Sequence, residues 1–173
     1  MWRKIIPREE KFFEMFNTMA ENADATVALL VEMMEDFDNL RDRASSIKGK
    51  EHLGDTHIHD LIRKSDVLIE NFAPGVMDRL KLDYESVRKI KKDIIYCSVS
   101  CFGHWGPYCH KPGYDMIAQG ASGWTDQNIS PQIAPVSIGD MNAAVHAAIA
   151  ICGALYSRLQ TGQGQNIDIS MMD

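Results

Sequence analysis

The run Ile94-Ile95-Tyr96-Cys97-Ser98-Val99 is short, mostly apolar and rich in β-forming residues, as expected of a β-strand. A similar run, Val67-Leu68-Ile69, precedes it, and a polar segment with helical spacing from Asp83 to Lys92 lies between the two. Strand, helix and strand at this spacing predict a βαβ unit, whose two strands must be parallel. We therefore expect an α/β fold built on a parallel sheet.

A long helix and a last strand follow this unit. The helix is predicted from Asp140 to Gln160, with Asp140 as a plausible N-cap and Gly162 just beyond its end. Its alanine-rich interior is apolar nearly all round, which predicts a buried helix. The final strand is expected from Asn166 to Ser170.

The first 60 residues have a different pattern, an apolar stripe with alternating steps of four and three residues. This spacing is that of a heptad seam and predicts a long amphipathic helix. Residues 36–39 could instead cap a second helix and form a helical hairpin, and periodicity alone leaves both forms open. The stripe consists of Phe12, Phe16, Met19, Ala23, Thr26, Leu30, Met33, Phe37, Leu40, Ala44 and Ile47.

Composition limits the classes of function. The 173 residues include 18 Lys and Arg against 24 Asp and Glu, which gives a net charge of -6. This acidic balance, without a basic run, argues against nucleic acid as a partner, and no stretch reaches the roughly 18 consecutive apolar residues of a membrane span. The four cysteines form no CxxC pair, and without a secretion signal we expect free, buried thiols in a cytoplasmic protein.

Six short motifs follow one another in the second half of the chain. They are Ser65 to Gly75, Tyr96 to Gly103, Gly106-Pro107-Tyr108, Lys111-Pro112-Gly113-Tyr114-Asp115, Ile138-Gly139-Asp140 and Thr161-Gly162-Gln163-Gly164-Gln165. With these motifs in this order, the segment from Leu61 to Asp173 resembles the family III CoA-transferases, the CaiB/BaiF or formyl-CoA transferase group. The resemblance implies a partial, Rossmann-like CoA-transferase core, with coenzyme A as a substrate and no permanently bound cofactor.

The resemblance identifies Asp140 as the catalytic nucleophile. It implies that the Asp140 carboxylate attacks an acyl-CoA thioester, and that an aspartyl-CoA thioester then passes CoA to a carboxylic acid. A carboxylate at a helix N-terminus faces unpaired backbone N–H groups, which favour its ionised form. A plain helix cap is the alternative interpretation of Asp140.

The resemblance also implies CoA-binding roles for Asn71, Phe72, Arg79 and Tyr114. Asn71 and Phe72 close the first strand, and α/β folds bind ligands beyond the carboxyl ends of parallel strands. Arg79 could pair with a phosphate of CoA, and an exposed helix charge is its alternative interpretation. Tyr114 replaces a histidine of the racemase branch, which favours a transferase because tyrosine is a poor base at neutral pH; simple packing in the loop is its alternative.

The first half carries a different resemblance. Met1 to about His59 is similar to the N-terminal part of the PhoU-like phosphate-transport regulators, in its opening from Trp2 to Phe13 and in Glu51-His52-Leu53-Gly54-Asp55. Those proteins are helical bundles, and some relatives bind metal. Glu51, Asp55 and His59 would share one helix face, so they either hold a divalent ion or form a solvated face; we assign no metal ligand.

The chain is thus expected to contain a helical segment, 1–60, and a partial CoA-transferase domain, 61–173. Its partners would be an acyl-CoA and a carboxylic acid, and exposed sheet edges predict a homo-oligomer. Three functions stay open: an incomplete CoA-transferase that is either active or inactive alone, a regulatory or metal-binding helical module, and a non-functional fusion.

Overall fold

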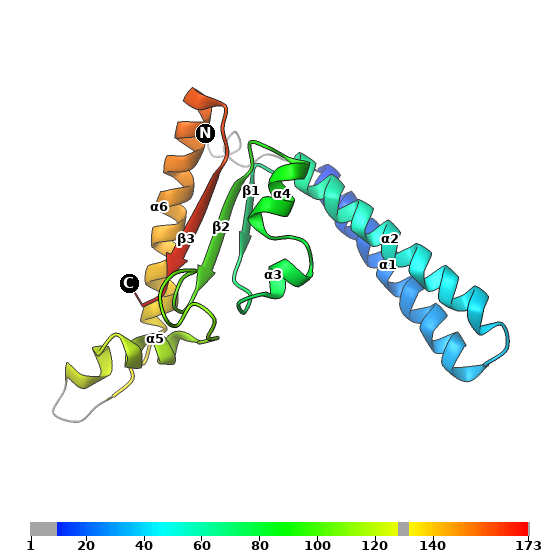
Figure 1. Ribbon diagram of the computed structural model, residues 1–173, viewed down its shortest axis with the longest axis horizontal. Helices are drawn as coiled ribbons and strands as arrows, with labels where there is room; N and C mark the ends of the chain where they lie inside the picture. The colour runs from blue at the N-terminus through cyan, green and yellow to red at the C-terminus, as the bar shows by residue number, and fades with distance from the viewer. Residues whose placement is uncertain (1–9, 128–131, 173) are drawn as a thin grey trace. The chain divides into compact units, whose positions relative to one another are not determined.

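The computed structural model describes residues 10–127 and 132–172, which fall into two compact units. One unit is Met1–Lys64 and the other is Ser65–Asp173. Figure 1 shows the helices of the first and the mixed helix and sheet of the second. Each unit is described by itself.

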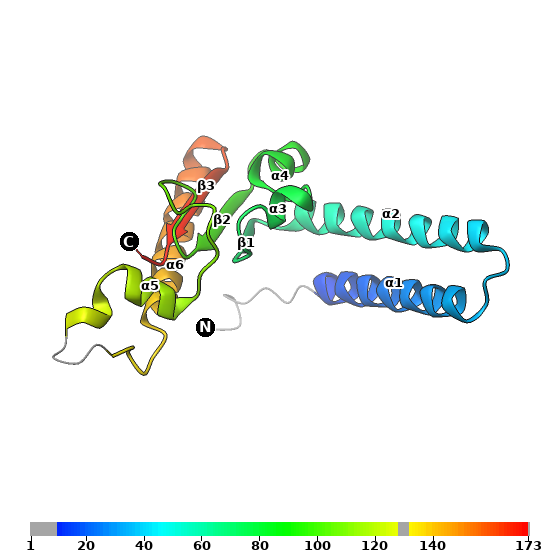
Figure 2. The ribbon, with the colours of Figure 1, turned by 60° about the horizontal axis from the view of Figure 1, so that its bottom comes forward.

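The first unit is a helical hairpin. Helix α1 (Glu10–Glu35) runs antiparallel to α2 (Leu40–Lys64), as Figure 2 shows. Asn39 has a positive φ of 59° in the turn between them. Arg43 closes this turn through an ion pair of 2.8 Å with Asp36. The hairpin, rather than one long helix, is therefore the form that the first 60 residues adopt.

The seam between the two helices contains only part of the predicted stripe. Phe16 and Leu30, both in the predicted stripe, are 55% and 44% exposed. Asn22 and Thr26 make the seam partly polar, and the Asn22 side chain donates a hydrogen bond of 2.9 Å to the carbonyl oxygen of Lys50. The α1 side of the seam is made by the partly buried residues Phe12, Met15, Met19, Asn22, Thr26, Leu29 and Met33. The predicted stripe is therefore confirmed for Phe12, Met19, Thr26 and Met33 and wrong for Phe16, Ala23 and Leu30, because two apolar rows share one helix.

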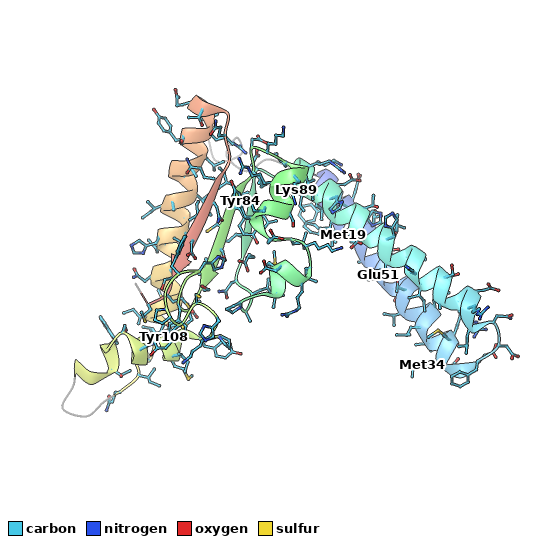
Figure 3. All side chains as sticks on the ribbon, in the orientation of Figure 1. Met19, Met34, Glu51, Tyr84, Lys89 and Tyr108 are labelled. Carbon is cyan, nitrogen blue, oxygen red and sulfur yellow. The ribbon has the colours of Figure 1, made fainter. Side chains whose placement is uncertain are left out.

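The second apolar row of α1 is exposed. It repeats the same steps, displaced by one residue from the seam, and consists of Phe13, Phe16, Ala20, Ala23, Val27, Leu30 and Met34. Figure 3 labels one residue of each row: Met19, which is partly buried, and Met34, which is 67% exposed. Helix α2 therefore covers only one of the two rows.

The second unit is built on a parallel sheet of three strands in the order β1-β2-β3. They are β1 (Val67–Glu70), β2 (Ile95–Ser100) and β3 (Gln165–Ser170). Cys97 in β2 lies opposite Ile69 on one side and Ile167 on the other. The predicted α/β fold with a parallel sheet is confirmed.

Helices cover both faces of β2, and all six of its residues are buried. On one face, Cys97 and Val99 pack against Ala143 and Ala147 of α6 (Ile138–Thr161). On the other face, the ring of Tyr96 lies edge-on to that of Tyr84, with centroids 5.9 Å apart. Burial raises the pKa of the Tyr96 hydroxyl, which donates a hydrogen bond to the carbonyl oxygen of Leu82.

The remaining helices are short. Helices α3 (Val76–Arg79) and α4 (Tyr84–Ile90) connect β1 to β2, and Asp83 caps α4 by accepting a hydrogen bond of 3.1 Å from the Ser86 amide. Helix α5 (Asp115–Ala121) and the 3₁₀ helix η2 (Trp124–Gln127) lie between β2 and α6. The four cysteines are free: two are buried, Cys109 is half-buried and Cys152 is exposed.

Helix α6 buries only one face, so the prediction of burial nearly all round was wrong. Met141, Ile149 and Leu159 on its other side are 62%, 65% and 79% exposed. Its buried residues are small, which lets the helix approach the sheet closely: they are Gly139, Ala143, Ala147 and Ala154.

Within the described residues, α6 is also the one helix long and apolar enough to cross a membrane, on length and composition alone. This is a weak sign of a membrane span, because the core helix of a soluble protein passes the same test. The expectation of no membrane span stays a prediction.

The backbone conformation of the motif Thr161 to Gln165 depends on its two glycines. Gly162 ends α6 with a positive φ of 70°, a conformation that costs other residues energy. Gly164 lies against the backbone that leads into β2. A Cβ there would overlap the carbonyl oxygen of Ile94 and lie 2.7 Å from the carbonyl carbon of Asp93. The motif therefore makes the turn from α6 into β3 possible.

We expect Gly164→Ala to lower the free energy of unfolding by about 2 kcal/mol, because the added methyl group forces the two backbones apart. Urea denaturation followed by tryptophan fluorescence measures this change. Gly153→Ala is the matched control, because no atom lies within 4 Å of a Cβ there; alanine should stabilise α6 by up to about 1 kcal/mol. Equal stability of the two variants would contradict the role of Gly164.

Candidate active site

The carboxyl ends of the three strands meet at one edge of the sheet, where they share a pocket of about 230 Å³. Asn71 follows β1, Cys101 follows β2 and Met171 follows β3, and all three line it. The loop after β2 and the first turn of α6 complete the lining. The pocket therefore lies where a parallel α/β sheet is expected to bind a ligand.

Four of the five predicted site residues line this pocket: Asn71, Phe72, Tyr114 and Asp140. They come from three separate segments of the chain. The fifth, Arg79, is exposed at the end of α3 and is not among the described residues that line the pocket. Sequence analysis gave no role to Lys111, Asp115 or Cys101, which line it as well.

The Asn71-Phe72 turn is held by polar contacts with the sheet. The Asn71 side chain donates a hydrogen bond of 2.7 Å to the carbonyl oxygen of Val99 in β2. The buried Glu70 carboxylate accepts one of 2.8 Å from the Phe72 amide and another from the Ser98 hydroxyl. The Phe72 ring itself is 55% exposed, so the turn presents a fixed aromatic face at the pocket.

The first turn of α6 carries Asp140, but Asp140 is not its N-cap. The helix begins at Ile138, and its N-cap is Ser137, whose side chain makes no capping hydrogen bond. The Asp115 carboxylate accepts hydrogen bonds from the amides of Gly139 (2.7 Å) and Asp140 (3.2 Å) instead. The predicted N-cap was therefore wrong, because the capping group is 25 residues away in the chain.

The Asp140 carboxylate is exposed, and none of the described residues donates a hydrogen bond to it. Its charge acts on a neighbour: burial raises the pKa of the Cys101 thiol, and the charge of Asp140 raises it further. The thiol is therefore protonated at neutral pH.

The loop after β2 contains a lysine and aromatic rings that contact one another. The Lys111 ammonium lies 4.4 Å from the ring centroid of Tyr108, which Figure 3 labels. The ring of Phe102 packs against the same Tyr108 ring, with the two centroids 5.5 Å apart. Tyr114 is 78% exposed and has room to contact a ligand. Lys111 thus supplies positive charge to the pocket that Asp140 also lines.

A larger hollow, of about 660 Å³, lies beside the first turns of α6 and is lined mainly by apolar side chains such as Trp124, Met141 and Val145. None of its described lining residues is charged. The smaller pocket contains the Asp140 carboxylate, which has no hydrogen-bond donor among the described residues, so it is the candidate active site.

Within residues 10–127 and 132–172, no group of three or more His, Cys, Asp or Glu side chains is placed to hold a metal ion. Glu51, Asp55 and His59 follow one another along α2 without forming such a group.

Comparison with known proteins decides the family. The family model for CoA-transferase family III matches residues 44–173. The chain belongs to CoA-transferase family III. The resemblance inferred from the six motifs is confirmed for this family. The match to CoA-transferase family III begins inside α2 and includes the whole sheet unit and the pocket.

Several family III relatives are similar over the same part of the chain. An acetyl-CoA:oxalate CoA-transferase of Acetobacter aceti is 44% identical over 119 residues, which are 66% of this chain and 31% of that protein. A succinate–glutarate CoA-transferase of Agrobacterium fabrum is 38% identical over 120 residues, 67% of this chain and 30% of that protein. A solved CAIB/BAIF family protein from Brucella suis has a TM-score of 0.64 and 41% identity, covering 67% of this chain and 32% of that one. This family III chain spans about a third of the length of these relatives.

We expect Asp140→Asn to lower the pKa of the Cys101 thiol, because one of the two causes that raise it is removed. At a fixed alkaline pH, iodoacetamide should then alkylate Cys101 several-fold faster than in the wild type. Mass spectrometry of the Cys101 peptide across pH measures the shift.

Cys97 is an internal control, because burial and the charges of Glu70 and Asp168 raise its pKa. Its alkylation profile should be the same in both proteins. A common shift of both thiols would instead indicate a general opening of the fold.

Proposed function

We propose that this chain carries the nucleophile and part of the CoA site of a CoA-transferase, which moves CoA from an acyl-CoA to a carboxylic acid through Asp140. The observation that supports it most directly is the pocket that gathers Asn71, Phe72, Tyr114 and Asp140 at the carboxyl edge of the sheet. Membership of CoA-transferase family III supports the reaction class. The relatives named above act, by their names, on acetyl-CoA with oxalate and on succinate with glutarate.

In this proposal the Asp140 carboxylate attacks the carbonyl carbon of the acyl-CoA thioester. The carbon–sulfur bond breaks, which releases CoA thiolate and leaves a mixed anhydride between Asp140 and the acyl group. The thiolate then attacks the Asp140 carbonyl, so the acyl group leaves as a carboxylate and CoA stays on Asp140 as a thioester. An acceptor carboxylate repeats the two exchanges in reverse and leaves as the new acyl-CoA.

The other pocket residues have roles that follow from their positions. The exposed ring of Phe72 offers an apolar surface for the CoA chain, and Asn71 is fixed by its hydrogen bond to Val99 with its own oxygen free to accept. Lys111 attracts anionic substrates to the rim. Tyr114 faces the substrate from the loop before α5.

The PhoU-like alternative has only its motif resemblance in residues 1–59 as support. The family III match begins at residue 44 and so includes Glu51, Asp55 and His59. The relatives described above are CoA-transferases or CAIB/BAIF proteins. We therefore give the transferase function precedence. That the site is incomplete in this chain, that the protein self-associates and that it is cytoplasmic stay predictions.

Covalent capture of CoA by the whole chain tests the proposal. After incubation with acetyl-CoA, we expect mass spectrometry to find CoA joined to Asp140 as a thioester, which borohydride reduces to an alcohol. Asp140→Asn should give no adduct. Asp78→Asn, a matched change of an exposed carboxylate in the first turn of α3, should give the wild-type amount.

If the wild-type chain binds neither CoA nor acetyl-CoA in calorimetry, the proposal is rejected. Binding without any adduct would instead leave a CoA-binding module without transferase chemistry. That outcome would reject the role of Asp140 alone.

Arg79 gives a second test, because the proposal assigns it a phosphate of CoA although it lies outside the pocket. We expect Arg79→Ala to weaken CoA binding by about tenfold in calorimetry, as the loss of one charge-assisted contact predicts. Arg88→Ala is the matched control from α4, and its affinity should equal that of the wild type. Equal affinities of both variants would show that Arg79 is only an exposed helix charge.

A further inference from the structure

The amides at the start of α6 are all satisfied, but not by the usual local cap. The Ile138 amide donates to the carbonyl oxygen of Val136 at 2.8 Å, and Met141 makes the first helical bond, to Ser137. The two amides between them, of Gly139 and Asp140, both donate to Oδ1 of Asp115. One side chain from α5 therefore caps the turn that carries Asp140.

The Asp115 carboxylate is fully engaged in this contact. Its second oxygen, Oδ2, accepts a hydrogen bond of 2.6 Å from the Gln119 side chain, one turn later in α5. A carboxylate with both oxygens engaged is poorly placed to act as a base or nucleophile. Its function is to hold other groups in position.

Gln119 also forms hydrogen bonds with the segment that leads into α6. It is a polar side chain only 2% exposed, and its Oε1 accepts a hydrogen bond of 2.8 Å from the Ala134 amide. Its Nε2 lies 3.4 Å from the carbonyl oxygen of Val136. Asp115 and Gln119 thus bind both the entering chain and the first turn of the helix.

Gly139 makes the close approach possible. A Cβ at this position would lie 3.0 Å from Oδ1 of Asp115 and 3.5 Å from the Cβ of Ala118. A side chain at residue 139 would therefore require the Asp115 carboxylate to move away from the turn by a few tenths of an ångström.

We infer that Asp115, supported by Gln119, is the positioning residue that aims Asp140 into the pocket; this inference rests on the proposed function. No local cap fixes the first turn of α6, so the direction of the Asp140 side chain depends on the bonds from Asp115. Displacement of a reacting group by about 1 Å costs about 10²-fold in rate. Loss of the Asp115 carboxylate should therefore slow the chemistry more than it weakens binding.

The test compares the rate of the Asp140–CoA adduct from acetyl-CoA with the affinity for CoA. For Asp115→Ala we expect the adduct to form about 10- to 100-fold more slowly, with a CoA dissociation constant within about twofold of the wild type. Asp115→Asn keeps an oxygen that accepts from the two amides, so it should recover part of the rate. Asp83→Ala removes a matched cap from α4 and should leave the rate unchanged.

A wild-type rate in Asp115→Ala would overturn the inference, as would an equal loss of rate and affinity, which indicates a general structural role. Hydrogen exchange gives a readout independent of activity: Asp115→Ala should speed exchange at the amides of Gly139 and Asp140, and Asp83→Ala should not. Unchanged exchange in Asp115→Ala would also overturn it. If the wild type forms no adduct, the proposed function fails while the exchange data still decide the role of Asp115.

Discussion

The pairing of β2 with a parallel strand on each side is the constraint on which the whole sheet unit depends. Parallel neighbours bring every carboxyl end to one edge, so the segments after Glu70, Ser100 and Ser170 meet there although they are far apart in the chain. Burial of both faces of β2 then requires α4 on one side and α6 on the other. The position of α6 in turn brings its first turn to the same edge, beside the pocket.

Three carboxylates near this edge accept hydrogen bonds from backbone amides. Glu70 accepts from the Phe72 amide at 2.8 Å, and Asp168 accepts from the His104 amide at the same distance. Asp115 does the same for the start of α6. Asp140 differs from these three, because its carboxylate has no donor among the described residues. At this edge, acidic side chains thus hold the loops in place, and Asp140 is the exposed carboxylate without a donor among the described residues.

Features that depend only on neighbouring residues could be predicted from the local sequence pattern. The apolar runs around Leu68 and Tyr96 gave the strands, and Gly162 marked the end of α6, because strand burial and left-handed backbone leave a signature in the adjacent sequence. The gathering of Asn71 and Asp140 in one pocket also followed from the parallel topology together with the family motifs.

Features that depend on distant partners could not be predicted in this way. The cap of α6 comes from Asp115, which no rule on neighbouring residues connects to Gly139. The apolar surface of α6 predicted burial all round, but the described residues supply a cover for only one side of it. Likewise, the predicted stripe combined residues from two rows of α1, since both rows have the same period.

Those two rows have a consequence for the hairpin. Since they are offset by one residue, a turn of α1 by about 100° about its own axis exchanges one for the other, and hydrophobic burial alone distinguishes poorly between the two arrangements. Asn22 supplies the distinction: in the observed arrangement its amide donates a hydrogen bond to the carbonyl oxygen of Lys50, and a Cβ at Gly54 would lie 3.6 Å from its amide nitrogen. A single partly buried amide therefore favours one rotation of a helix whose apolar surface would accept two.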